Sequence, residues 1–171
     1  MNNFWRVTAI CILSLVLLAC SGGSSPESDA DASSKTVSAS SEYPFMGVAE
    51  LDAYVKENAG KPTMALFWTT WCPSCKQEIP EMEKLNQTYS DKVNVITISL
   101  DEKVEALHQF FNGKDLDLPV YMGDEAIARK FGVEAIPTLV IFDKNGQQIF
   151  GKAGIFPHAM LEKMVDKMAG Q

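Results

Sequence analysis

The chain has 171 residues, of which 46% are hydrophobic and 22% are charged, and its formal net charge is −7. These values are typical of one globular domain with short additional segments. A net negative charge of this size argues against nucleic acid and against an anionic lipid surface as electrostatic partners.

The first segment, residues 1–19, is predicted to be a targeting signal. Its only charged residue is Arg6, and the mainly apolar run 7–19 is shorter than the roughly 18–20 residues that span a bilayer. The run ends in Leu17-Leu18-Ala19-Cys20, which resembles a bacterial lipobox and implies lipid attachment at Cys20. A plain secretory signal that ends near Ala19 is the alternative. Both interpretations export the protein to the cell envelope, facing the periplasm, and Ser21 implies the outer membrane in a Gram-negative cell.

Residues 20–42 are predicted to form a flexible tether between the lipid and the folded domain. The segment is rich in Ser, Gly, Ala and Asp and has little apolar bulk to offset its ordering entropy. A flexible chain of this length reaches about 25 Å. With Cys11 removed and Cys20 lipidated, Cys72 and Cys75 are the thiols that remain, so no structural disulfide competes with them.

Residues 43–171 are expected to form the folded domain. In its first half, the periodicity predicts a helix at 49–58, a buried central strand at 64–68, a helix from 72 to about 90, and a strand at 93–100. Pro80 lies inside the second helix and predicts a kink, because proline removes one backbone hydrogen bond.

The second half continues the alternation of helices and strands. Asp101 is predicted to cap a helix that contains Val104, Leu107, Phe110 and Phe111. An extended piece at 118–122 and a helix capped by Asp124 follow. A strand at 138–142, a turn at 143–146 and a partner strand at 147–150 are predicted to form a hairpin. A last helix begins at Pro157, and its residues predicted to face inward are Met160, Leu161, Met164, Val165 and Met168. This order predicts an α/β sandwich.

The motif Trp71-Cys72-Pro73-Ser74-Cys75 opens the second predicted helix. Unpaired N–H groups and the dipole at a helix N-terminus favour an anion, and they lower the pKa of such thiols from about 8.5 to roughly 3.5–7.5. Cys72 is therefore the predicted nucleophile, and Cys75, one turn later, is predicted to resolve the mixed disulfide. Pro73 fits the first turn, where a missing N–H costs no hydrogen bond.

Two other uses of a Cys-x-x-Cys pair are disfavoured. Zinc requires two further ligands, but the chain has no second Cys pair, and His108 and His158 stand alone in their segments. A haem attachment site has His after the second Cys, where this chain has Lys76. We therefore expect a redox-active disulfide and no metal or other cofactor.

Two segments resemble the signatures of thioredoxin. They are residues 68–75 with Pro80, and residues 132–142 followed by Asn145-Gly146. The match runs from Pro44 to the end and implies a thioredoxin fold, a central mixed β-sheet flanked by helices. The signatures lie further apart than in bare thioredoxin because residues 101–122 add one helix and one strand. With the lipobox and the Trp-Cys-Pro-x-Cys motif, this insertion makes the chain resemble the TlpA/ResA-like envelope thiol–disulfide oxidoreductases.

This resemblance implies the reduction of disulfides in exported proteins such as apocytochrome c, with a membrane thiol–disulfide transporter as electron donor. Pro137 matches the cis-proline that faces the dithiol, and X–Pro bonds are the ones that adopt the cis form routinely. The Ile136 backbone would pair with the bound substrate strand. Trp71, Pro73 and Ser74 complete the predicted substrate-binding set.

Glu78 matches the buried acid of ResA-like proteins, which tunes the dithiol and exchanges a proton with the second cysteine. It lies three residues past Cys75 and thus on the same helix face. The alternative is an ordinary exposed helix charge. Bare thioredoxin keeps its buried carboxylate six residues before the first Cys, where this chain has Leu66.

Other functions remain open from the sequence. A dithiol oxidase or isomerase of the same fold usually has a His between its cysteines and a larger helical insertion. A copper-handling lipoprotein could use Cys72, Cys75 and a Met, but the spacing of Met160, Met164 and Met168 fits core packing better. The intact cysteine pair disfavours a non-catalytic binding module.

Overall fold

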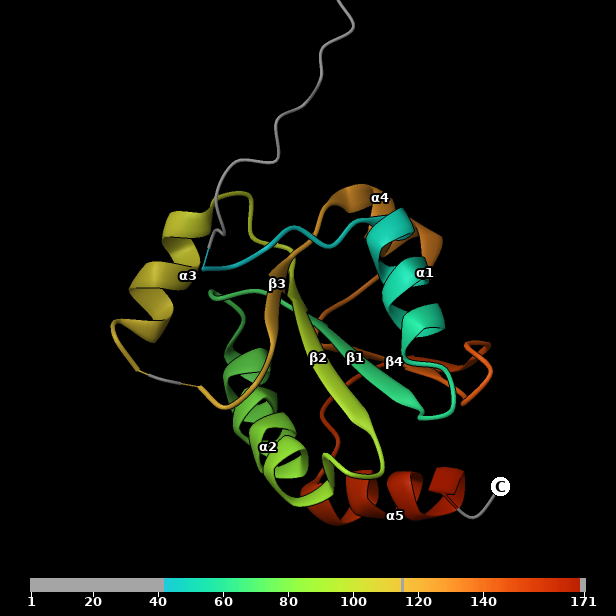
Figure 1. The fold of residues 1–171 in the computed structure, drawn as a ribbon. Helices are drawn as coiled ribbons and strands as arrows, with labels where there is room; N and C mark the ends of the chain where they lie inside the picture. Colours follow the sequence, from blue (N-terminus) through green and yellow to red (C-terminus); the bar gives the residue numbers. More distant parts are fainter. Residues whose placement is uncertain (1–41, 115, 170–171) are drawn as a thin grey trace, which may run out of the picture. The chain divides into compact units, whose positions relative to one another are not determined.

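The computed structural model describes residues 42–114 and 116–169. The predicted signal segment and the tether up to residue 41, with Cys20, lie outside the described residues. A mixed sheet with helices on both faces makes up the described part (Figure 1). This arrangement confirms the predicted α/β architecture.

In the described part of the chain, the sheet has five strands in the order β3-β2-β1-β4-β5. They are β1 (Thr63–Trp68), β2 (Asn94–Ser99), β3 (Val120–Met122), β4 (Thr138–Phe142) and β5 (Gln148–Ala153). β1 pairs in parallel with β2, and β2 with β3, whereas β4 runs antiparallel to both β1 and β5. The carboxyl ends of β1, β2 and β3 therefore meet at one edge of the sheet, where the chain leaves β1 for the Cys-x-x-Cys motif.

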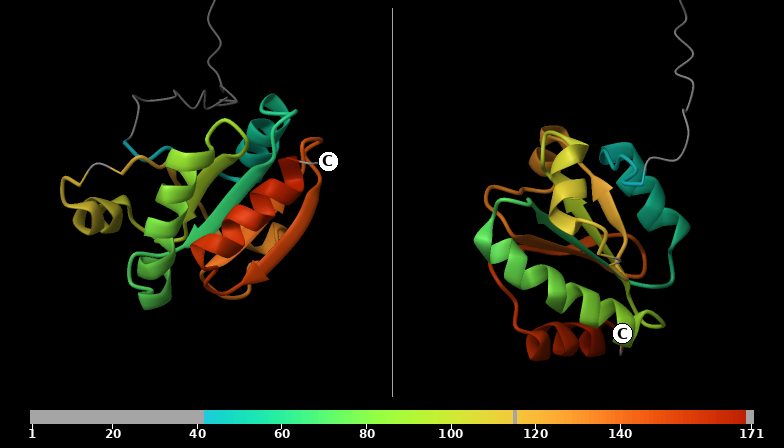
Figure 2. Two further views of the ribbon diagram at one scale, coloured as in Figure 1. Left: turned by 90° about the horizontal axis from the view of Figure 1, so that it is seen from below. Right: turned by 90° about the vertical axis from the view of Figure 1, so that its left-hand side faces the viewer.

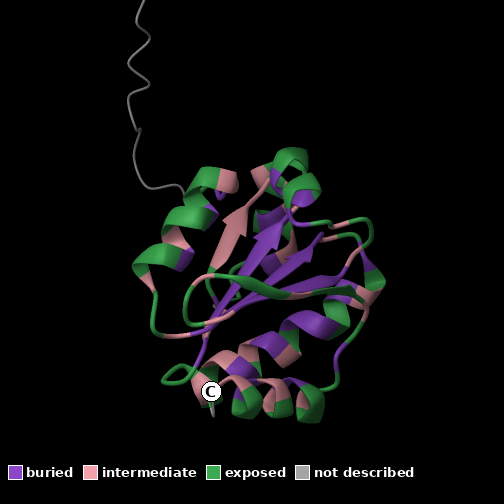
Figure 3. Ribbon diagram, turned by 90° about the vertical axis from the view of Figure 1, so that its right-hand side faces the viewer, coloured by how far each residue is buried: buried purple, intermediate pink, exposed green. Residues whose placement is uncertain are grey.

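Within residues 42–114 and 116–169, five helices cover the sheet. They are α1 (Val48–Glu57), α2 (Pro73–Tyr89), α3 (Val104–Phe111), α4 (Glu125–Lys130) and α5 (His158–Ala169). Figure 2 shows α2 and α5 side by side. Figure 3 shows that the buried positions concentrate in the central strands β1, β2 and β4 and on one side of each longer helix.

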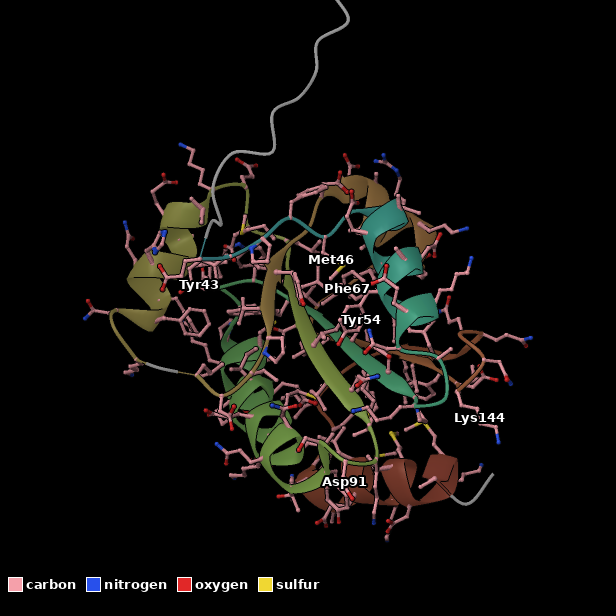
Figure 4. All side chains as sticks on the ribbon, in the orientation of Figure 1. Tyr43, Met46, Tyr54, Phe67, Asp91 and Lys144 are labelled. Carbon is pink, nitrogen blue, oxygen red and sulfur yellow. A yellow bond between two sulfur atoms is a disulfide. The ribbon has the colours of Figure 1, made fainter. Side chains whose placement is uncertain are left out.

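Alternate residues of β1 belong to two separate hydrophobic cores, one on each face of the sheet, because successive side chains of a strand point to opposite faces. Met64, Leu66 and Trp68 belong to the cluster shared with α2, α3 and α5. Ala65 and Phe67 belong to the cluster shared with α1 and α4, which also contains Met46 (Figure 4). All six residues of β1 are buried, as predicted for a central strand covered on both faces.

The expected insertion forms α3 and β3, and the N-terminal end of the domain packs against it. Met46 donates its N–H to the Met122 carbonyl at 2.7 Å, and Met122 donates to the Pro44 carbonyl at 2.9 Å, so residues 44–46 extend the sheet beyond β3. The Tyr43 ring stacks on Phe111. The sequence reasoning did not predict this extra edge pairing.

Three details differ from the sequence expectations. Lys103, not Asp101, is the N-cap residue of α3, because the Asp101 side chain is bonded elsewhere. Met160 is 48% exposed instead of facing inward, since α5 buries Leu161 and Val165 and Met160 falls on the neighbouring side of the helix. The last strand continues to Ala153, three residues past the predicted end.

Candidate active site

Cys72 and Cys75 form a disulfide where β1 gives way to α2, with their Cα atoms 5.2 Å apart. Cys72 is the N-cap residue of α2, and its Sγ accepts a hydrogen bond from the Cys75 backbone N–H at 3.1 Å. Pro73 occupies the first position of the helix, as predicted. This N–H would likewise stabilise a Cys72 thiolate after reduction.

Cys72 and Cys75 differ in how far each is exposed to solvent. Cys75 is completely buried, while Cys72 retains 5% of its surface. Trp71 and Pro73 beside it are exposed, with Trp71 at 70%, and Ser74 is half-buried. A partner can therefore reach the disulfide only from the Cys72 side, which suits Cys72 as nucleophile and Cys75 as resolving thiol. Trp68, at the end of β1, is fully buried against Phe110 and Phe111 and so does not reach the partner-facing surface.

The loop before β4 lies next to Cys72. The Ile136–Pro137 peptide bond is cis, as the resemblance implied. The Cys72 Sγ lies 3.9 Å from the Ile136 carbonyl oxygen. Pro137 is buried, and its carbonyl accepts a hydrogen bond from the Gly154 N–H at 2.9 Å, which ties this loop to the end of β5. The fold thus brings together two motifs that are more than 60 residues apart in the chain.

Glu78 is completely buried in α2, so the alternative of an exposed helix charge is wrong. Its Oε2 accepts a hydrogen bond from the Phe156 N–H at 2.9 Å, whereas its Oε1 is buried without a hydrogen-bond partner among the described residues. Burial raises the pKa of Glu78 to about 7; the Phe156 hydrogen bond opposes this shift, and the nearby Glu81 charge adds to it. A carboxyl group with this pKa, one helical turn from Cys75, can exchange a proton near neutral pH.

The sequence did not lead us to place Phe156, Asp101 and Thr70 in this neighbourhood. Phe156 contributes only its backbone N–H to Glu78, which leaves no side-chain signature. Asp101 accepts hydrogen bonds from the Thr70 backbone N–H at 2.8 Å and from the Thr70 hydroxyl at 2.9 Å. An acidic residue directly after a predicted strand was the available signal, because strand ends carry the functional loops of parallel sheets.

No group of three or more His, Cys, Asp and Glu side chains within residues 42–114 and 116–169 is placed to hold a metal ion. Over the same residues, no helix has the length and apolar character needed to cross a membrane.

Comparison with known proteins places these features in context. A family model described as thioredoxin-like matches residues 60–148. Thioredoxin-like protein YneN of Bacillus subtilis is 33% identical over 95 residues, and the match covers 54% of this chain and 56% of YneN. Thiol-disulfide oxidoreductase ResA of Bacillus thuringiensis is 34% identical over 117 residues, which are 67% of each chain. The crystal structure of StoA from Bacillus subtilis superposes with a TM-score of 0.55 at 26% identity, covering 62% of this chain and 83% of StoA.

Proposed function

The chain belongs to the thioredoxin-like family, and on that premise we propose that it is a thiol–disulfide oxidoreductase that reduces disulfides in exported proteins. The observation that carries this proposal is the Cys72–Cys75 disulfide at the N-terminus of α2, with the Cys72 sulfur 3.9 Å from the carbonyl oxygen that precedes a cis-proline. The name of the relative ResA, a thiol-disulfide oxidoreductase, supports the same activity.

The reaction starts from the reduced protein, in which Cys72 is a thiolate and Cys75 a thiol. The Cys72 thiolate attacks one sulfur of the partner's disulfide, forms a mixed disulfide and releases the partner's other sulfur as a thiolate. Cys75 loses its proton to the Glu78 carboxylate and attacks the Cys72 sulfur. The partner leaves with two reduced sulfurs, and the protein keeps the Cys72–Cys75 disulfide. Two electrons have moved from this protein to its partner.

The Cys72 surroundings also suggest how a partner binds. The Ile136 backbone, next to the sulfur, pairs with the extended segment that carries the partner's disulfide. Trp71, Pro73 and Ser74 form the surface around it, and the buried Pro137 holds the loop that presents the Ile136 backbone. We propose exported proteins, apocytochrome c among them, as substrates, and a membrane thiol–disulfide transporter as the donor that restores the dithiol.

The direction of the reaction is tested by equilibrating the protein with glutathione redox buffers and quantifying the Cys72–Cys75 disulfide. A reductase should have a reduction potential well below that of glutathione. The cytosolic glutathione pool, measured by biochemical extraction, lies at about −220 to −260 mV. A value near −120 mV, as in a strong oxidant, would instead assign the protein to the dithiol oxidases.

Partners are identified by trapping. In Cys75→Ser, the resolving thiol is absent, so mixed disulfides through Cys72 should accumulate in cells and separate on a non-reducing gel. Cys72→Ser/Cys75→Ser is the matched control and should trap nothing. The absence of adducts with Cys75→Ser would contradict exchange with protein substrates.

The location of the protein is a separate part of the proposal. Residues 1–19 direct export, and lipid on Cys20 anchors the domain to the envelope membrane on the periplasmic side, with residues 20–42 as the tether. Cys20→Ser should abolish incorporation of labelled fatty acid and move the protein from the membrane to the soluble envelope fraction. Unchanged membrane association of this variant would contradict the anchor.

A further inference from the structure

A buried carboxyl group is bonded to the loop that leads into the redox motif. Asp101 is 6% exposed and lies just after β2. Its Oδ2 accepts hydrogen bonds from the Thr70 backbone N–H at 2.8 Å and from the Ser99 hydroxyl at 2.7 Å, and its Oδ1 accepts one from the Thr70 hydroxyl at 2.9 Å. Such a set of donors compensates the loss of water around the group, and it fixes the carboxyl group with respect to Thr70.

Residues 69–71 form the short connection between β1 and α2. At its start, the Trp68 carbonyl accepts a hydrogen bond from the Leu100 N–H at 2.8 Å, which continues the pairing of β1 with β2. At its end, Cys72 caps α2. Trp71 is 70% exposed and has little packing to hold it. The two bonds from Thr70 to Asp101 therefore fix the middle of the connection, two residues before the reactive sulfur.

We propose that Asp101 is a positioning residue for the redox site, which holds Thr70 and so sets the location of the Cys72 sulfur. The relevant neighbours of that sulfur are the Cys75 N–H, at 3.1 Å, and the Ile136 carbonyl oxygen, at 3.9 Å. Asp101 acts through Thr70 and takes no direct part in the chemistry. Misplacing a reacting group by about 1 Å can slow a reaction by roughly 10²-fold, so modest movement of this loop has a measurable effect. The inference rests on the proposed function, because that function supplies the reaction whose rate changes.

Two substitutions separate positioning from a simple charge effect. Asp101→Asn removes the charge and replaces one acceptor oxygen with a donor. Thr70→Val keeps the charge and the shape and removes only the hydroxyl donor. Positioning predicts that both variants react more slowly. A charge effect predicts that Asp101→Asn reacts faster, since a negative group near a thiolate disfavours it, and that Thr70→Val is unchanged.

The experiment uses the full-length chain in detergent, reduced and then mixed with oxidised glutathione. We expect the second-order rate constant to fall about tenfold in Asp101→Asn, by loop displacement, and about threefold in Thr70→Val, by loss of one hydrogen bond. Thr70→Ser keeps a hydroxyl and should stay within about twofold of the unsubstituted protein. The double variant should be no slower than Asp101→Asn alone, because both changes break the same contact.

The control is Asp124→Asn. Asp124 accepts the Ile127 N–H at 2.9 Å as the N-cap of α4, so it is also a hydrogen-bonded carboxyl group, but its bond lies outside the redox loop. Its variant should keep the rate constant of the unsubstituted protein. Rate constants within twofold of that value for both Asp101→Asn and Thr70→Val would overturn the proposal, as would a faster Asp101→Asn with an unchanged Thr70→Val. If Asp101→Asn does not fold, the pair Thr70→Val and Thr70→Ser decides.

A second readout separates this inference from the proposed function. The pH profile of Cys72 alkylation by iodoacetamide reports the environment of the sulfur without any disulfide substrate. We expect its midpoint to move by about half a pH unit in Thr70→Val and to be restored in Thr70→Ser. If the unsubstituted protein fails to reduce oxidised glutathione, the proposed function fails while this shift still supports the positioning role. An unmoved midpoint in Thr70→Val contradicts that role in either case.

Discussion

The two cores on either side of the sheet differ in what they bury. The hydrophobic cluster under α1 and α4, which includes Met46, contains no cysteine. The cluster under α2, α3 and α5 includes Cys72 and Cys75, and α2, which supplies Cys75, also buries Glu78. Burying a carboxyl group is unfavourable unless it is hydrogen-bonded, and one oxygen of Glu78 has no such partner among the described residues. One face therefore serves stability, whereas the other gives up some stability for chemistry.

The largest effect should come from the reactive sulfur. Cys72→Ser should reduce the turnover of protein disulfides to the uncatalysed level, because the attacking thiolate is lost. Reduction of insulin followed by turbidity measures this loss, and circular dichroism should show a folded protein. Appreciable turnover by the variant would mean that Cys75, although completely buried, attacks substrates by itself.

A matched pair of isoleucines tests the division between the faces. Ile96 is fully buried under α1 and α4, and Ile79 is 3% exposed on α2, next to Glu78. Either residue changed to Ala should lower the free energy of unfolding by about 2–5 kcal/mol in denaturant titration. Only Ile79→Ala should also shift the reduction potential, because it loosens the packing around Glu78. A shift of about 30 mV or more in Ile96→Ala, equivalent to roughly 1.4 kcal/mol, would contradict the division.

Glu78 should make the stability of the oxidised protein depend on pH. The pKa of Glu78 is raised to about 7 in the folded state, so between its ordinary value of 4.5 and 7 the folded protein binds a proton that the unfolded chain has lost. The contribution of Glu78 to stability is therefore largest below about pH 4.5 and is lost as the pH rises towards 7. Glu78 is completely buried, and a pKa shift of this size corresponds to a loss of about 3 kcal/mol.

Denaturant titrations at several pH values measure this dependence, with Glu78→Gln as the matched variant. Glutamine keeps the size of the side chain and does not titrate, so the slope assigned to Glu78 should disappear. Equal slopes in the two proteins would show that Glu78 ionises in the folded state as it does in the unfolded chain.

The smallest expected effect on stability is at the exposed rim of the redox face. Trp71→Ala should change the free energy of unfolding by less than about 0.5 kcal/mol, because the side chain is 70% exposed. It should nevertheless raise KM for a protein disulfide about fivefold, the loss of about 1 kcal/mol of binding. The rate with oxidised glutathione, which is too small to cover Trp71, provides the control. Equal losses with both substrates would place Trp71 in the chemistry and not in partner binding.

Much of the architecture could be predicted from the sequence because it depends on local patterns. The apolar run 64–68 required a covered strand, Asp124 caps α4 through its own side chain, and Pro73 starts α2. Asp101 shows where such reasoning fails. As a residue type before a helix it predicts a cap, but its oxygens are instead taken by Thr70, a residue 31 positions earlier in the chain. A pattern read from neighbouring residues does not show that Thr70 competes with the helix N-terminus for the Asp101 oxygens.

The sequence by itself determined the order of elements and the identity of the reactive sulfurs, since periodicity and the Cys-x-x-Cys spacing are short-range properties. Only the tertiary structure decided that Glu78 is buried, that the Phe156 N–H is its partner, and that Ile136 lies beside Cys72. These outcomes depend on which helix packs on which face and on how distant loops meet at one edge of the sheet. Burial, and with it the raised pKa of Glu78, is a property of the packed assembly and not of the segment that carries the residue.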